Sequence, residues 1–386
     1  MHHFQFQNPT KIIFGAGQIS NLSSNIPQGS KVLMLYGGGS IKHNGIYEQV
    51  KKSLSAYEFL EFGGIEPNPR YETLLKAIEY IRKENVDFLL AVGGGSVIDG
   101  TKFIAAATYY QGDAWDLCNG AKAIKAMPFG TILTLPATGS EMNCGAVISR
   151  ESSHEKLVFS SPLVYPTFSI LDPTVTLSLP PRQRANGVVD AFIHVTEQYL
   201  TYPVDAAVQD RFAEGLLLTL IENGKIYVNE PENMEAASNI VWASTLALNG
   251  LIAVGVPEDW GTHMIGHELT ALTGLDHART LATVWPRLQM ALKESKKEKL
   301  LQFAARVWNI TEKTEADPNL RISQAIANTD QFFQSLGVKT HLSDYGLALG
   351  LGEQIAERFS KRGVLNLGEK GEITPNLACQ IVNQSY

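Results

Sequence analysis

Three of the chain's nine histidines lie within one stretch, HMIGHELTALTGLDH, residues 263–277. His263 and His267 are four positions apart, so on a helix they share one face. His277 follows Gly274, a residue type that often stands just beyond a helix C-terminus. Imidazoles gathered at this spacing indicate a site for a divalent metal ion.

A second pair with the same spacing lies upstream in NGVVDAFIHVTEQYL, where Asp190 precedes His194 by four residues. Its neighbours are largely apolar, and a buried carboxylate or imidazole without a partner costs several kcal/mol. A single pair would be explained by an Asp190–His194 hydrogen bond in a satisfied core. Two such pairs together with His277 favour a metal site. One carboxylate and up to three imidazoles suit zinc or ferrous iron, whereas calcium and magnesium prefer more oxygen ligands.

The order of residues in HMIGHE argues against a metalloprotease. Glu268 follows the second histidine, whereas the glutamate of an HExxH motif follows the first. This weakens the main rival interpretation, a metal-dependent hydrolase. No cysteine lies nearby, so a catalytic metal site is favoured over a structural zinc site.

The sequence GGGS occurs twice, at residues 37–40 and 93–96, each time after an apolar, strand-like run. A third turn of small residues, Thr138–Gly139–Ser140, follows another such run. Glycines at a strand–helix junction let the backbone approach a ligand, and the exposed N–H groups favour phosphate. One such turn would be a plain connection that needs positive φ, but three in succession favour a phosphate site at one edge of the sheet. The turns match neither the GxGxxG fingerprint nor a Walker sequence, so they indicate phosphate and no more.

Strand-like and helical stretches alternate through the first 180 residues, as in YETLLKAIEYIRKENVDFLLAVGGGSVIDGTKFIAAA. Such alternation predicts βαβ units and a parallel sheet. After Pro180–Pro181, long helical patterns dominate and no comparably clear strand is visible. We therefore predict an α/β domain over residues 1–180 and an all-helical domain over residues 181–386.

Composition narrows the possible partners and the compartment. The formal net charge of −7 gives no reason to expect nucleic acid or an anionic membrane as a partner. The three cysteines form no CxxC pair, which suits a reducing compartment. The N-terminal residues lack the pattern of a signal peptide, and no apolar run is long enough to span a bilayer. We expect a cytoplasmic protein.

Five motifs together resemble the iron-containing (group III) alcohol dehydrogenase family, and the likeness runs essentially end to end. They are EFGGIEPNP (61–69), AVGGGSVIDGTKF (91–103), LTLPATGSEMN (133–143), NGVVDAFIHVTEQY (186–199) and HMIGHELTALTGLDH (263–277). The chain is most similar to the bacterial NADPH-dependent aldehyde reductases of the butanol dehydrogenase branch. The resemblance implies a Rossmann-like parallel-sheet domain followed by an all-α domain, the dehydroquinate synthase-like architecture. It also implies a homodimer.

The resemblance further assigns roles to individual residues. It implies that the metal ligands are Asp190, His194, His263 and His277, and that His267 lies near the nicotinamide and substrate as a candidate proton relay. Further positions match cofactor contacts of the family; they are Gly37, Gly38, Gly39, Ser40, Gly94, Gly95, Ser96, Asp99, Thr134, Thr138, Asn143 and Lys156.

The implied reaction is the reversible reduction of an aldehyde to a primary alcohol by hydride transfer from NADP(H), with the carbonyl oxygen polarised by Zn²⁺ or Fe²⁺. NAD-preferring relatives tend to carry an aspartate at the position of Gly39, and glycine removes a carboxylate that would repel a 2′-phosphate. Ser40 and Lys42 could contact that phosphate, so we predict NADPH over NADH. Two departures from the family are Ala278 after the last ligand and Thr273 in place of a further histidine. A non-redox enzyme of the dehydroquinate synthase type, a metal-dependent hydrolase and a non-catalytic nucleotide sensor are the alternatives.

Overall fold

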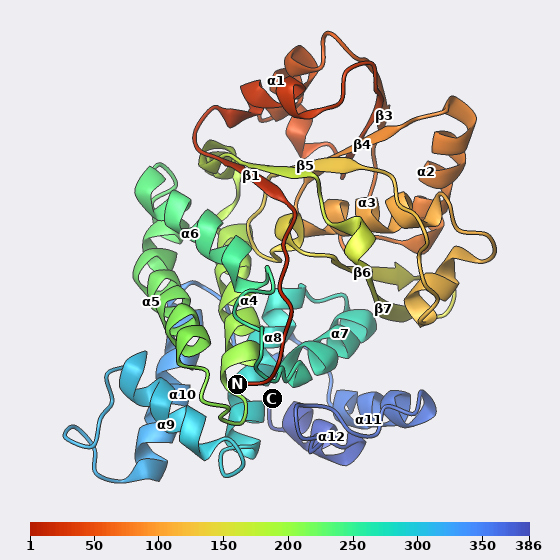
Figure 1. Ribbon diagram of the computed structural model, residues 1–386. Helices are drawn as coiled ribbons and strands as arrows, with labels where there is room; N and C mark the ends of the chain where they lie inside the picture. The colour runs from red at the N-terminus through yellow and green to blue at the C-terminus, as the bar shows by residue number, and fades with distance from the viewer. The chain divides into compact units, whose positions relative to one another are not determined.

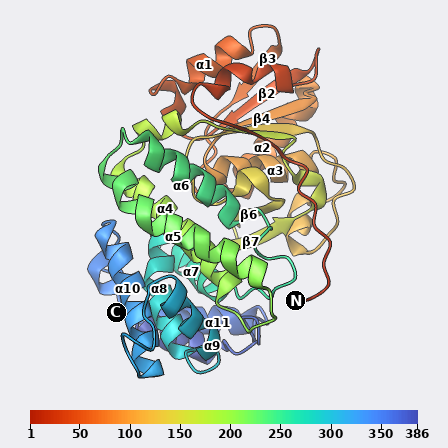
Figure 2. The same ribbon diagram turned by 60° about the vertical axis from the view of Figure 1, so that its left-hand side comes forward.

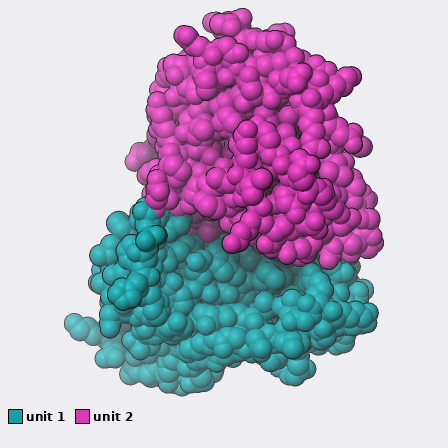
Figure 3. Space-filling view, turned by 45° about the vertical axis from the view of Figure 1, so that its right-hand side comes forward, with its two compact units in different colours: residues 1–6, 181–230, 250–386 teal, residues 7–180, 231–249 magenta.

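The computed structural model describes residues 1–386, which form two compact units (Figure 3). The α/β unit consists of residues 7–180 and 231–249. The helical unit consists of residues 1–6, 181–230 and 250–386. A division into domains at residue 180 stays a prediction.

The α/β unit is built on one six-stranded parallel sheet with the strand order β1-β8-β5-β4-β2-β3 (Figure 1). Its strands are β1 (Lys11–Phe14), β2 (Lys31–Tyr36), β3 (Glu58–Phe62), β4 (Phe88–Gly93), β5 (Phe129–Leu133) and β8 (Phe168–Leu171). The central strands β4 and β5 are buried along their whole length, as near-continuous apolar runs between two layers require. The predicted parallel sheet is confirmed.

A separate hydrophobic core covers each face of this sheet. Neighbouring residues of β2 point into different cores. Leu33 packs with Leu74 and Phe103 on one face of the sheet, whereas Val32 packs with Val50 on the other. The helices of this unit are α1 (Ile46–Ser53), α2 (Tyr71–Glu84), α3 (Gly95–Ala107) and α6 (Met234–Ala247). An antiparallel hairpin, β6 (Gly145–Arg150) and β7 (Glu155–Ser160), completes the unit.

The carboxyl ends of β2, β4 and β5 lead into the three small-residue turns. These strands are parallel neighbours, so their carboxyl ends share one edge of the sheet, as predicted. From β2 the chain continues to β3 on one side, while β4 and β5 extend the sheet on the other. The two GGGS turns therefore flank the point where the strand order reverses, which is where open α/β sheets bind ligands.

The helical unit contains no strand, and none of its helices is long and apolar enough to cross a membrane. Helix α4 (Pro181–Tyr199) packs along α5 (Ala207–Asn229) and α8 (His277–Ala291) (Figure 2). It is buried on all sides from Gly187 onward. It begins at Pro181, where a proline costs no helix hydrogen bond. The helices are α4 (Pro181–Tyr199), α5 (Ala207–Asn229), α7 (Gly261–Thr273), α8 (His277–Ala291), α9 (Lys297–Arg306), α10 (Pro318–Ser335), α11 (Leu351–Lys361) and α12 (Pro375–Asn383).

Candidate functional site

Three helices of the helical unit supply the predicted metal ligands. Asp190 and His194 lie one turn apart on the buried helix α4. His263 lies in the first turn of α7, and His277 is the first residue of α8. Gly274 ends α7 with a φ of 71°, which confirms the predicted helix end and lets the chain turn into α8.

The four side chains converge on one carboxylate oxygen. Oδ1 of Asp190 lies 3.8 Å from Nε2 of His194, 3.8 Å from Nε2 of His263 and 3.9 Å from Nε2 of His277. These separations are too long for hydrogen bonds. Two ligand atoms that each lie about 2.0–2.2 Å from one ion can be at most ~4.4 Å apart, so the distances fit a shared divalent cation.

The surroundings of His263 favour a cation. Its Nε2 atom is buried and makes no hydrogen bond, as expected for an atom that faces a metal ion. Burial lowers the pKa of His263, but the carboxylates of Glu197 and Asp190 outweigh this and raise the pKa to about 9. The two carboxylates therefore make the electrostatic potential at His263 negative, which favours a cation. The donor set of one carboxylate and three imidazoles fits zinc or iron.

His267, predicted to serve the reaction and not the metal, lies one turn further along α7 and is 8% exposed. Its ring centroid is 4.8 Å from that of His277 and 6.1 Å from that of His263. Donor atoms of Asp190, His263 and His277 lie within 4.8 Å of one another, and neither His267 nor His194 belongs to this group. His194 differs from His267 in that its Nε2 lies 3.8 Å from Asp190 Oδ1. Thr273, the last residue of α7, donates its hydroxyl hydrogen to the backbone oxygen of Leu269.

The sequence interpretation did not single out Glu197, which is 2% exposed and contacts His263 directly. One carboxylate oxygen of Glu197 lies within hydrogen-bond distance of His263 Nδ1. The other accepts the backbone N–H groups of Thr262, at 2.6 Å, and His263, at 3.3 Å. A signal was present in the sequence, since Asp190, His194 and Glu197 are spaced i, i+4, i+7 and so share one helical face.

Buried ion pairs fix α7 within the helical unit. Glu268, 4% exposed, pairs with Arg358 of α11 and with Arg362, which follows the end of that helix. Just before α7, Asp259 accepts the backbone N–H of Gly261 at 2.7 Å and also pairs with the buried ammonium of Lys296 at 2.5 Å. These contacts hold the helix that carries His263 and His267 at its start and near its middle.

In the α/β unit, the first GGGS turn leaves open space above the backbone. A Cβ atom added at Gly38 or Gly39 would meet nothing within 4 Å, and Gly39 has a φ of 97° that favours glycine. The second turn is packed differently. A Cβ added at Gly95, the first residue of α3, would lie 2.3 Å from Oγ1 of Thr138, so glycine is needed for the third turn to approach the second.

Two of the residues predicted to contact the cofactor form side-chain hydrogen bonds with the third of these turns. Asp99 accepts hydrogen bonds from the Ser140 hydroxyl at 2.5 Å and from the Val147 N–H at 2.8 Å, and burial raises its pKa. Asn143 donates to the backbone oxygens of Gly139 and Leu248. It also accepts from the buried ammonium of Lys102 at 2.7 Å.

The remaining predicted cofactor residues are arranged around the same edge. Lys156 donates to the side chain of Asn68 at 2.8 Å, and the backbone N–H of Asn68 donates to the Ser96 hydroxyl at 3.3 Å. The backbone N–H of Thr134 donates to Gly93 O at 3.0 Å. The structure thus gathers these positions around the carboxyl ends of the strands, and their contacts with a cofactor stay predictions.

Two family models match the chain from near its start to near its end. Residues 9–173 match the iron-containing alcohol dehydrogenase model, and residues 184–365 match the C-terminal model of the Fe-containing alcohol dehydrogenase family. The chain belongs to the iron-containing alcohol dehydrogenase family. It is therefore an oxidoreductase, and the predicted family is confirmed.

Several relatives align over nearly the whole chain. The NADPH-dependent aldehyde reductase YqhD of Escherichia coli is 54% identical, with 99% of each chain covered. A probable NADH-dependent butanol dehydrogenase of Bacillus subtilis is 41% identical over 94% of this chain and 95% of its own.

Crystal structures of relatives have the same fold as this chain. The structure of E. coli YqhD has a TM-score of 0.97 at 53% identity, covering 100% of this chain and 99% of that one. The NADH-dependent butanol dehydrogenase A of Thermotoga maritima has a TM-score of 0.95 at 34% identity, with coverage of 100% and 99%.

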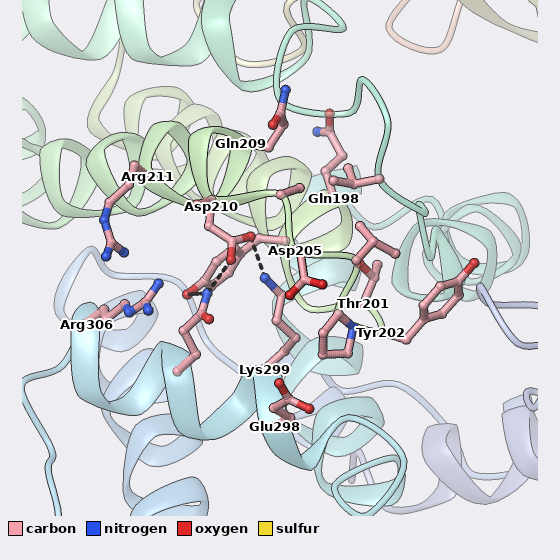
Figure 4. A pocket seen from close by; sticks show the side chains of 17 residues that line it. Gln198, Thr201, Tyr202, Asp205, Gln209, Asp210, Arg211, Glu298, Lys299 and Arg306 are labelled. Atoms are coloured by element: carbon pink, nitrogen blue, oxygen red, sulfur yellow. Dashed lines mark hydrogen bonds and ion pairs between the residues drawn. The ribbon is translucent and has the colours of Figure 1, made fainter. Parts of the chain in front are cut away.

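This iron-containing alcohol dehydrogenase family member also has a polar pocket of about 260 Å³ beside the end of α4 (Figure 4). Its charged groups largely satisfy one another: Lys299 of α9 pairs with Asp210 of α5 at 2.5 Å, and Gln302 donates to Asp210 at 2.8 Å. None of the predicted metal or cofactor residues lines this pocket. We therefore regard it as a structural feature of the helical unit.

Proposed function

We propose that this chain reduces aldehydes to primary alcohols, reversibly, with NADP(H) as the hydride carrier and one divalent metal ion. The observation that carries the proposal is the convergence of three imidazoles on the Asp190 carboxylate in a member of the iron-containing alcohol dehydrogenase family. The aldehyde reductase activity of YqhD, 54% identical over 99% of the chain, supports the choice of substrate class.

The metal would be held by Asp190, His194, His263 and His277. Zn²⁺ or Fe²⁺ at this position supplies a Lewis acid that polarises the carbonyl oxygen, while NADPH supplies the hydride. The carboxylate of Asp190 provides the negative charge of the site and is 4% exposed, so solvent screens its interaction with the cation only weakly.

His267 would return a proton to the oxygen of the product, directly or through water. It is buried beside His277 and belongs to the same rigid helix as His263, so α7 holds a ligand and a proton donor at a fixed spacing of one turn. General acid catalysis by a positioned histidine contributes about 10²–10⁴-fold in rate.

The first GGGS turn supports NADPH as the preferred cofactor. Gly39 carries no carboxylate, and Lys42 follows in the short 3₁₀ helix Ser40–Lys42. Lys42 lies 5.0 Å from the ring centroids of Tyr36 and Tyr47 and 3.6 Å from the Glu61 carboxylate. The ammonium group of Lys42 would attract the 2′-phosphate of NADPH as a point charge. NADH has no 2′-phosphate and would not gain this contact.

A direct assay tests the proposal. Purified protein is mixed with butanal and NADPH, and the absorbance of the reduced nicotinamide is followed before chelation, after chelation and after addition of Zn²⁺ or Fe²⁺. We expect loss of absorbance that stops on chelation and returns with one of the ions. No consumption of NADPH with several aldehydes, in protein that binds metal and nucleotide, would instead favour a non-redox reaction of the dehydroquinate synthase type. None of the relatives described above is a hydrolase or a synthase.

We further propose that the protein is a cytoplasmic homodimer. All three cysteines are free thiols, which suits a reducing compartment. The dimer is expected from the resemblance to the family, and light scattering after size-exclusion chromatography tests it, since a monomeric mass would contradict it.

A further inference from the structure

Two backbone N–H groups in the first turn of α7, those of Thr262 and His263, have no hydrogen-bond partner within the helix. The residue before the helix, Trp260, is in the left-handed conformation with a φ of 60°, and its side chain makes no capping hydrogen bond. The first N–H groups of a helix have no partner within the helix, and a buried N–H without a partner costs about 1–3 kcal/mol. Thr262 and His263, whose N–H groups lie in this first turn, are both buried.

Glu197, on the neighbouring helix α4, supplies the missing partner. Its Oε1 accepts the N–H groups of both Thr262 and His263. A carboxylate at a helix N-terminus also interacts favourably with the helix dipole. The side chain of Glu197 is only 1% exposed, so these interactions are screened little by water.

The second oxygen of the same carboxylate contacts the imidazole of His263. Carboxylate oxygens accept hydrogen bonds, so this contact favours the tautomer of His263 that carries the proton on Nδ1. In a neutral imidazole this leaves the lone pair on Nε2, the nitrogen that lies 3.8 Å from Asp190 Oδ1. The contact therefore sets both the tautomer and the direction of the ring.

We propose that Glu197 is a positioning residue of the metal centre: it fixes His263 as a ligand through Nε2 while it caps the helix that carries His263. The proposal rests on the proposed metal-dependent function. Carboxylates that hold a ligating imidazole in this way typically raise metal affinity or activity by about 10–100-fold. Glu197 thus links two of the ligand-bearing helices, α4 and α7, through one side chain.

The test measures metal affinity without aldehyde or nucleotide. Metal-free wild type, Glu197→Gln and the control Glu214→Gln are titrated with Zn²⁺ in competition with a chromophoric chelator. Glu214 is a suitable control because it is also buried, at 5% exposed against 2% for Glu197, and lies in the same unit on α5. It hydrogen-bonds Tyr199 and Arg306 but none of the proposed ligands. We expect Glu197→Gln to weaken Zn²⁺ binding by ~10–100-fold and Glu214→Gln to change it by less than about threefold.

Two further readouts separate positioning from a merely structural role. The visible absorption of the Co²⁺-loaded protein reports the geometry of the ligands and should change in Glu197→Gln but not in Glu214→Gln. A Zn²⁺ affinity within about threefold of wild type, together with a lowered unfolding midpoint of the metal-free protein, would overturn the proposal and leave Glu197 as a helix cap alone. If Glu197→Gln does not fold, Glu197→Asp keeps the charge near α7 but withdraws it from Nδ1, and unchanged affinity there would overturn the proposal equally.

The outcomes also separate this inference from the proposed function. Weakened Zn²⁺ binding in Glu197→Gln would support the role of Glu197 even if no aldehyde were reduced. Metal-dependent aldehyde reduction by the wild type, with equal metal affinity in the variant, would refute the role of Glu197 alone. A wild type that binds no divalent metal would refute both.

Discussion

The carboxylate oxygen Oδ1 of Asp190 lies 3.8 Å from Nε2 of His263, although the two side chains come from different helices, α4 and α7. Neither atom can hydrogen-bond the other at this distance, whereas both can contact one cation. The same oxygen is nearly equidistant from His194 and His277. The most direct predictions therefore concern the metal content of variants.

Replacement of His263 by alanine should remove metal and activity together. The variant lacks one of the four proposed ligands, so the remaining three should bind the ion more weakly. We expect a metal-to-protein ratio near zero after dialysis, measured by inductively coupled plasma mass spectrometry, and no NADPH-dependent butanal reduction. Full metal occupancy in His263→Ala would contradict its assignment as a ligand.

Replacement of His267 by alanine should leave the metal bound and lower only the activity. His267 shares α7 with His263 but is not one of the three imidazoles proposed as ligands, whose Nε2 atoms lie 3.8–3.9 Å from Asp190 Oδ1, so the metal should remain bound. The rate of aldehyde reduction should fall by about 10²–10⁴-fold if His267 donates the product proton. The same metal analysis checks the first expectation and single-turnover kinetics the second; an apo His267→Ala protein would exclude the relay role.

Replacement of Lys42 by alanine should weaken NADPH binding selectively. Charge-assisted hydrogen bonds to phosphate are strong, but the Lys42 side chain is 43% exposed and its charge is partly screened, so we expect KM for NADPH to rise ~10-fold. KM for NADH should change little, because NADH has no 2′-phosphate. Lys52→Ala, an exposed lysine on the adjacent helix α1, is the control. Equal effects on both cofactors would refute a contact between Lys42 and the 2′-phosphate.

The parts of the fold that follow from local patterns could be predicted from the sequence. The buried runs that became β2, β4 and β5 end in turns of small residues, so their parallel pairing and common edge followed from connectivity rules. The short strands β1, β3 and β8 and the hairpin β6–β7 were not predicted. Strand β3, EFLEF, is at most partly buried and contains two glutamates among its five residues, so its hydrophobic pattern is weak.

The candidate site was predictable as a set of ligands but not as a geometry. The i, i+4 spacings of Asp190 with His194 and of His263 with His267 place each pair on one helical face, yet they do not say which histidine turns away from the metal. The structure adds that Nε2 of His194, His263 and His277 each lies 3.8–3.9 Å from Oδ1 of Asp190. Glu197 was missed because a glutamate in a polar-looking end of a helix is usually solvated, and its burial depends on the packing of α7 against α4.

Replacement of Glu268 by glutamine should destabilise the anchoring of α7 on α11. The change removes one charge from a cluster in which Arg358 and Arg362 are each about one-quarter exposed, so hydration offsets part of the loss. We expect ~1–3 kcal/mol of destabilisation and a lower thermal unfolding midpoint, measured by calorimetry. Glu357→Gln, which removes only an exposed pair with Lys361, should leave the midpoint unchanged. An unchanged midpoint in Glu268→Gln would show that the arginines find other partners.

The buried cluster of Lys296, Asp259 and Glu369 should make stability depend on pH. Lys296 Nζ lies 2.5 Å from Asp259 and 3.2 Å from Glu369, so one ammonium serves two carboxyl groups. Burial and the hydrogen bond with Asp259 raise the pKa of Glu369 to about 7, from 4.5 in an exposed glutamate. Because the folded-state pKa is the higher one, the stabilisation is complete below pH 4.5 and is lost as the pH rises towards 7.

Glu369→Gln tests this sign directly. Glutamine resembles the protonated carboxyl, so at about pH 5 the variant and the wild type should unfold at similar temperatures. At about pH 8 the wild type must hold an ionised Glu369 beside ionised Asp259, and the variant should unfold at the higher temperature of the two. Thermal midpoints of both proteins across this range give the comparison. A difference that stays constant with pH, or that favours the wild type more as the pH rises, would show that Lys296 stabilises both carboxylates in their ionised form.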